Sequence, residues 1–120
     1  MRITSFKDLV VWQLSDKLFM MIVADAEKFP ASRAARIITD QVIRSIASIG
    51  ANIAEGAGRG GKRELTRYLI IARGSLVESQ DWIHKLSNLG YITVTRQAIY
   101  EDLFITLRIK INAFIGKLRT

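Results

Sequence analysis

The polar side chains whose types and spacing could form a functional site occur in residues 41–59. Gln41, Ser45, Ser48 and Asn52 follow one another at steps of four, three and four residues, which places them on one face of a helix. Amide and hydroxyl groups at this spacing can form a hydrogen-bonded network between helices, or they can line a site for a polar ligand. No nucleophile, base and orienting group accompany them, so the pattern does not indicate an enzyme.

The third predicted helix, residues 62–89, supplies the partners for this face. A hairpin that folds about residue 59 places Ser45 opposite Arg73 and Gly74, and Gln41 near Glu78. The candidate polar network is therefore Gln41, Ser45, Asn52, Arg73 and Glu78. Glycine inside a helix costs about 1 kcal/mol of stability relative to alanine, and such a residue usually has a packing reason. Gly74 therefore predicts a close helix crossing. A structural network and a buried ligand site both remain open, and no second signal supports the ligand.

Other signals for catalytic or cofactor chemistry are weak. Gly56 to Lys62 has the spacing of a phosphate-binding loop, but Arg63 stands where a serine or threonine would hold magnesium, and the loop follows a helix rather than a strand. Glu55 and Glu78 fall at different heights of the hairpin and do not predict an acid–base pair. The chain has one histidine and no cysteine, so we expect no metal site and no cofactor.

Four amphipathic segments position these residues, at about 5–28, 32–56, 62–89 and 95–118. Helices of similar length joined by short connections are typical of an antiparallel up-down-up-down four-helix bundle. The predicted fold is therefore all-α, in a single domain of 120 residues. No run of apolar residues approaches the length of a membrane span, and no signal peptide is evident. We therefore expect a cytoplasmic protein without a membrane partner.

The ends of the predicted helices carry recognisable signals. Ser5, Ser32 and either Thr93 or Thr95 are the expected N-cap residues. Gly90 followed by an apolar residue predicts a Schellman motif at the end of the third helix.

The predicted core faces differ in width between the helices. The third helix has a single stripe formed by Leu65, Leu69, Ala72, Leu76, Ser79, Ile83 and Leu86. The expected stripe of the last helix consists of Ile99, Leu103, Leu107, Ile111, Phe114 and Leu118. Ile105 and Ile109 add a second apolar stripe there, and the first helix is apolar around much of its circumference. Faces this wide are compatible with packing inside the bundle, or with packing both inside it and against another subunit.

The net charge of +7 is concentrated at one predicted end of the bundle. The acidic side chains at that end are Asp8, Glu55 and Glu64. The eight basic side chains there are Arg2, Lys7, Arg59, Lys62, Arg63, Arg67, Lys117 and Arg119. A clustered basic patch is typical of binding to a phosphate backbone, although it can also serve solubility alone. The candidate nucleic-acid-binding residues are Arg59, Lys62, Arg63, Arg67, Lys117 and Arg119.

Several motifs resemble one known family in order and over nearly the whole chain. They are Ser5-Phe-Lys-Asp-Leu-Val-Val-Trp-Gln13, Phe29-Pro30, Gln41, Ser48-Ile-Gly-Ala-Asn-Ile-Ala-Glu-Gly-Ala-Gly-Arg59, Gly74-Ser-Leu-Val-Glu78 and Leu89-Gly-Tyr-Ile92. The chain resembles the four-helix-bundle proteins encoded in intervening sequences of bacterial 23S rRNA genes, and the related accessory variability determinant of diversity-generating retroelements. Gly60-Gly-Lys-Arg63 departs from the more usual polar, serine-containing start of the third helix.

The resemblance implies a homopentameric barrel of four-helix bundles, and for the retroelement branch it implies binding of nucleic acid and of a reverse transcriptase. It supplies no catalytic residue. The leading hypothesis is a non-enzymatic accessory protein that binds RNA or DNA through its basic end. The alternative is a ring-shaped scaffold for a protein partner such as a reverse transcriptase. An enzyme or a small-ligand binder is the least supported reading of the sequence.

Overall fold

The computed structural model describes residues 3–120 and is all-α over that range. A short 3-10 helix, η1, at Phe6–Asp8 precedes four long helices. They are α1 at Val10–Ala26, α2 at Arg33–Gly58, α3 at Lys62–Asn88 and α4 at Val94–Leu118. No strand occurs among residues 3–120.

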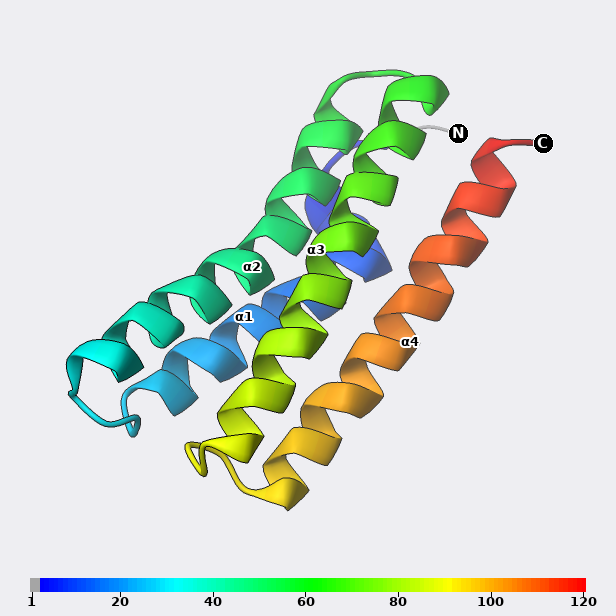
Figure 1. Cartoon of the computed structure of the whole chain (residues 1–120). Coiled ribbons are helices and arrows are strands. Elements are labelled where there is room, and N and C mark those ends of the chain that lie inside the picture. The colour runs from blue at the N-terminus through cyan, green and yellow to red at the C-terminus, as the bar shows by residue number, and fades with distance from the viewer. Residues whose placement is uncertain (1–2) are drawn as a thin grey trace.

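The four helices form an elongated body whose principal extents are 46 × 22 × 19 Å. Consecutive helices run in opposite directions, so the α1–α2 and α3–α4 turns share one end (Figure 1). The α2–α3 turn lies at the other end, together with the last turn of α4 and the N-terminal segment (Figure 1). This topology places residues from both halves of the chain at the end that carries the predicted basic patch.

Capping interactions set the boundaries of the helices, as the sequence signals predict. The hydroxyl of Ser32 accepts a hydrogen bond from the Ala35 N–H at 3.2 Å, and the hydroxyl of Thr93 accepts one from the Arg96 N–H at 3.0 Å. Gly90 adopts a positive φ of 75°, and the N–H of the following residue, Tyr91, bonds to the Leu86 carbonyl at 3.0 Å. This is the predicted Schellman motif.

The first helix begins later than the expected position near residue 5. Ser5 caps η1 by accepting a hydrogen bond from the Lys7 N–H at 3.2 Å, and Leu9 is extended, so the chain changes direction before α1 starts. This bend brings the ring of Phe6 edge-on to the ring of Trp12, with 5.1 Å between ring centroids. Aromatic packing therefore replaces a continuous first helix.

The core stripe of α3 is confirmed, because all seven of its predicted members are buried. The stripe predicted for α4 is wrong in part. Its buried residues are Tyr100, Phe104, Leu107, Ile111, Ile115 and Leu118. Ile99 is exposed, and Leu103 and Phe114 are only partly buried. The hydroxyl of Tyr100 donates to the Asp25 carboxylate at 2.6 Å, and this contact with α1 orients the start of α4.

Candidate nucleic-acid interface

A glycine in α2 allows the two central helices to approach closely near the α2–α3 turn. A methyl group at Gly56 would lie 2.6 Å from the Cβ of Tyr68 and 3.4 Å from the Cα of Leu65. The predicted close crossing at Gly74 is wrong, because a methyl group there would meet nothing within 4 Å. Gly74 lies on the exposed side of α3, so the prediction gave it the wrong face, and Ser45 lies opposite Ser79 and not opposite Gly74.

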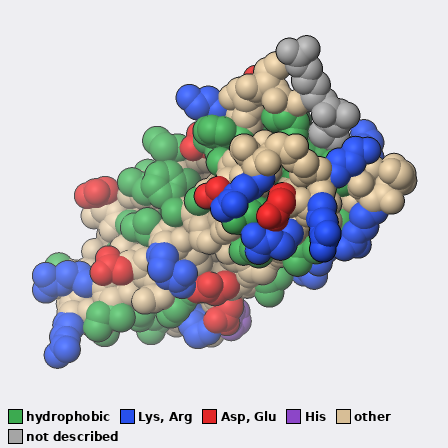
Figure 2. Space-filling model, turned by 90° about the horizontal axis from the view of Figure 1, so that it is seen from above, with side chains coloured by type: hydrophobic (Ala, Val, Ile, Leu, Met, Phe, Trp, Pro, Cys, Tyr) green, Lys and Arg blue, Asp and Glu red, His purple; other side chains and the backbone are tan. Residues whose placement is uncertain are grey.

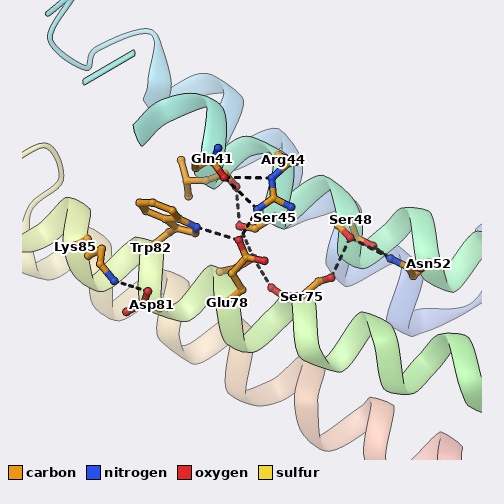
Figure 3. Close-up of polar contacts among 12 residues, drawn as sticks. Gln41, Arg44, Ser45, Ser48, Asn52, Ser75, Glu78, Asp81, Trp82 and Lys85 are labelled. Carbon is orange, nitrogen blue, oxygen red and sulfur yellow. Dashed lines mark hydrogen bonds and ion pairs between the residues drawn. The ribbon is translucent and has the colours of Figure 1, made fainter. Parts of the chain in front are cut away.

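A line of hydroxyl and amide groups joins α2 to α3 on the side of this crossing that is farther from the α2–α3 turn (Figure 3). The Ser79 hydroxyl donates to the Ser45 hydroxyl at 3.0 Å, and the hydroxyls of Ser48 and Ser75 lie 2.9 Å apart. The Asn52 amide donates to the backbone carbonyl and to the hydroxyl of Ser48. We call these five residues the α2–α3 seam.

Gln41 and Glu78 meet at the outer edge of the seam through Arg44. The Arg44 guanidinium donates to the Gln41 side-chain oxygen at 3.2 Å and forms an ion pair with Glu78 (Figure 3). Glu78 also accepts a hydrogen bond from the Trp82 indole N–H at 3.2 Å. The structure thus brings Gln41, Ser45, Asn52 and Glu78 to one interface, with Arg44 as a member that the sequence did not single out.

Arg73 does not join this network. Its guanidinium donates to the Asn112 side-chain oxygen on α4 at 2.8 Å, and Ser45 faces Ser79 instead. The expected pairing differs from the observed one by about one and a half helical turns, and Arg73 also lies on the side of α3 that faces α4. Within residues 3–120, every buried side-chain nitrogen and oxygen has a hydrogen-bond partner. The seam therefore leaves no buried side-chain nitrogen or oxygen without a partner.

At the basic end, two of the six candidate arginines and lysines already have acidic partners. Arg59 pairs with Glu55 at 3.0 Å and Arg67 pairs with Glu64 at 2.9 Å. Both guanidinium groups also lie against the ring of Tyr68, at 5.3 and 4.6 Å from its centroid. The hydrogen bond from Arg67 lowers the pKa of Glu64, so this carboxylate stays ionised beside its partner.

The other four candidates, Lys62, Arg63, Lys117 and Arg119, form no ion pair within the described chain. We call them the unpaired basic group. Viewed from this end, Lys and Arg side chains gather on the near face with acidic side chains among them (Figure 2). Arg2, counted with this end from the sequence, lies outside the described residues.

One member of the unpaired basic group, Lys62, lines a hollow between the α2–α3 turn and the last turn of α4; Arg63, Lys117 and Arg119 are sequence neighbours of the lining residues Lys62 and Leu118. Lys62 and Leu118 both line it, so the first turn of α3 and the end of α4 lie across a common depression. The N-cap of α3 is Gly61, which has no side chain to bind the first N–H groups of the helix. The partial positive charge of that helix end adds to the field of Lys62 and Arg63.

The comparisons with known proteins agree with this architecture. A sequence model of the family described as 23S rRNA-intervening sequence protein matches residues 7–113. The chain belongs to this family. A crystal structure from Bacteroides thetaiotaomicron VPI-5482, described as a protein with unknown function from the S23 ribosomal protein family, has the same fold with a TM-score of 0.82. It is 24% identical, and the match covers 92% of this chain and 98% of that one. No curated protein shows significant similarity to the chain.

For this member of the family, two features of the basic end escaped the sequence reasoning. The ring of Tyr68 contacts both Arg59 and Arg67 and joins them into one cluster. Arg59 and Tyr68 lie on opposite sides of the α2–α3 turn, and their spacing in the sequence gave no hint of the contact. The division of the basic residues into paired and unpaired ones also depended on side-chain geometry. The i, i+3 and i, i+4 spacing of Glu64 with Arg67 and of Glu55 with Arg59 was the signal that could have predicted it.

No group of three or more potential metal-ligating side chains occurs in the part of the chain that the structure describes. Among those same residues, no helix is both long enough and apolar enough to cross a membrane.

Proposed function

We propose that this protein is a non-enzymatic nucleic-acid-binding protein whose contact surface is the basic end of the bundle. The observation that carries the proposal is the unpaired basic group: four cationic side chains at the two helix ends of this end of the bundle have no ion-pair partner among residues 3–120, and one of them, Lys62, lines a hollow there. Such a cluster attracts phosphate groups and releases counterions from the nucleic acid when it binds them.

The six predicted binding residues have unequal roles in this proposal. Lys62, Arg63, Lys117 and Arg119 can approach a phosphate without first losing a carboxylate contact. Arg59 and Arg67 would have to give up hydrogen bonds to Glu55 and Glu64 or share them. We therefore assign the phosphate contacts to the unpaired basic group, and we assign Arg59 and Arg67 to holding the α2–α3 turn through Tyr68.

The test compares two triple variants with equal loss of charge. Lys62→Ala/Arg63→Ala/Lys117→Ala should weaken binding of labelled single strands across sequences, and should lower the slope of log affinity against log salt by about 2 units. The control variant, Lys28→Ala/Arg33→Ala/Arg36→Ala, removes exposed charge from the opposite end. Fluorescence anisotropy at low and physiological salt measures both. Equal effects of the two variants would show that net charge, and not the basic end, governs binding.

We also propose that the protein works as a homo-oligomer, with the pentamer implied by the family resemblance as the expected form. Ile105 and Ile109 on α4 are 52% and 63% exposed, and Met20 on α1 is 61% exposed. Apolar side chains this open on two helices favour burial against another subunit. Repetition of the basic end around a ring would raise affinity through multivalency. Light scattering at micromolar concentration should give a mass above that of the 13.5 kDa chain, and Ile109→Glu should reduce it.

A protein partner, for example a reverse transcriptase, is the second candidate. The observation that favours it is a largely apolar groove of about 390 Å³ between α1 and α4, lined by Leu9, Val10, Val11 and Phe114 with Lys110 and Lys117 at its edge. In this case the positive charge serves solubility. A partner that stays bound after nuclease treatment, together with absent binding to nucleic acid at low salt, would favour this scaffold function over the first proposal.

A further inference from the structure

The hollow at the basic end has an interior that differs chemically from its rim. Its volume is about 370 Å³, and its floor includes Ala57, Leu65 and Leu118. Leu65 and Leu118 are only 4% and 6% exposed, so the floor is aliphatic and firmly packed but presents little surface, and polar atoms make up about half of the hollow's lining. The rim is formed by Gly60, Gly61 and Lys62, and no acidic side chain lines any part of the hollow.

This combination selects the kind of group that can enter. An aliphatic floor disfavours a phosphate or another ion, because burial removes the water that such a group needs. A flat and weakly polar ring fits the floor and leaves its edge near the backbone groups of the rim. Gly60 and Gly61 have open space around them, so no side chain shields that backbone from an entering group. The ammonium group of Lys62 at the rim suits a phosphate attached to the ring.

We propose that the hollow receives one unpaired nucleobase of a single-stranded nucleic acid, while the neighbouring phosphates lie on the unpaired basic group. This inference rests on the proposed function and specifies its substrate class. The volume stands near the lower end of the range of about 300–1,000 Å³ for small-molecule pockets, which is enough for one base and too small for several. A base inside a duplex would first have to leave its stack and its pair, so single strands, bulges and loops are the preferred ligands.

The test uses fluorescein-labelled oligoadenylate, the same backbone with central abasic positions, and a duplex of the same length, each as RNA and as DNA. The abasic strand keeps the phosphates and loses the rings. Removal of the bases should weaken binding about tenfold through the lost apolar contact, and the duplex should bind no better than the abasic strand. This difference in either sugar series supports the proposal.

Two variants test the location of the base. Ala57→Leu fills the floor, and Gly61→Leu places a side chain at the open rim, where the extended φ of −158° is compatible with any residue. Each should weaken binding of oligoadenylate about tenfold and leave binding of the abasic strand unchanged. Ala98→Leu adds the same side chain at an exposed position at the opposite end of the bundle and should alter neither affinity. Circular dichroism shows whether each variant keeps its helices, and Gly61→Leu provides the test if Ala57→Leu does not.

The outcomes separate this inference from the proposed function. Salt-dependent binding that is equally tight for the base-bearing and abasic strands overturns the base site and leaves the phosphate contacts standing. A loss that is the same for both strands in the two filling variants also overturns the base site. No binding of any strand at low salt overturns the proposed function, and the base site with it.

Discussion

Two glycines of the central helices, Gly56 in α2 and Gly74 in α3, should respond in opposite directions to the same substitution. At Gly56 an added methyl group would lie 2.6 Å from the Cβ of Tyr68, an atom fixed to the backbone of α3. The helices would have to separate, and overpacking of this kind costs about 1–3 kcal/mol. At Gly74 the added methyl group meets nothing within 4 Å, so only the gain in helix propensity of about 1 kcal/mol remains.

The expected free energies of unfolding follow from these two values. Gly56→Ala gains about 1 kcal/mol of helix propensity and loses about 3 kcal/mol to the close contact, for a net destabilisation of about 2 kcal/mol. Gly74→Ala should be about 1 kcal/mol more stable than the wild type. With a urea m-value of about 2 kcal/mol/M, the midpoint falls by about 1 M for the first variant and rises by about 0.5 M for the second.

Urea unfolding followed by circular dichroism measures both variants. All samples need the same protein concentration, because association contributes to apparent stability. Gly58→Ala is the matched control in α2, since the structure shows open space at Gly58 as well. Wild-type stability of Gly56→Ala would refute the assigned helix contact, and a lower stability of Gly74→Ala would refute the open environment assigned to that residue.

Three further variants test contacts within the bundle. Asp25→Ala leaves the guanidinium of Arg96 and the hydroxyl of Tyr100 without their shared acceptor. Chemical denaturation should show that the free energy of unfolding falls by about 3 kcal/mol. A fall of less than about 1 kcal/mol would mean that the contact of Asp25 with α4 is no stronger than a surface ion pair. Burial, followed by the hydrogen bond to Asp25, raises the pKa of Tyr100. The unfolded chain therefore releases this proton first above about pH 10, and the wild type should lose stability relative to Tyr100→Phe by up to about 1.4 kcal/mol per pH unit; a constant difference from pH 8 to 11 would argue against it. Ser79→Ala removes the donor to Ser45 and should cost about 1 kcal/mol in urea unfolding, whereas an unchanged midpoint would mean that this hydrogen bond contributes nothing to stability.

Local signals predicted the helices well, because a cap or a stripe depends on residues close together in the chain. Ser32, Thr93 and Gly90 act where the sequence placed them. The start of the first helix was predicted too early, because the ring contact of Phe6 with Trp12 and the extended Leu9 depend on packing. A serine such as Ser5 can cap a 3-10 turn or a longer helix, so its presence alone did not predict how far the helix continues.

The faces of the helices were harder to predict than their ends. In α4, apolar residues surround the helix, so the sequence could not decide between a stripe through Ile99 and one through Tyr100. The carboxylate of Asp25 on α1 decides it by accepting the Tyr100 hydroxyl. The assignment of Arg73 to α2 was wrong in two respects: chain length gave a pairing about one and a half turns away from the observed one, and the direction of Arg73 toward Asn112 depends on the whole bundle.

The chemistry of the α2–α3 seam has a practical consequence for experiments on this protein. Its members are serines and an asparagine, none of which changes charge between acidic and alkaline pH. The hydroxyl and amide contacts of the seam therefore depend neither on a titration nor on salt, and the one ion pair at its edge, Arg44 with Glu78, is exposed and contributes little to stability. The seam's contacts persist as ionic strength rises, so a change in nucleic-acid affinity along a salt series reports the contact at the basic end more than a loosening of the hairpin.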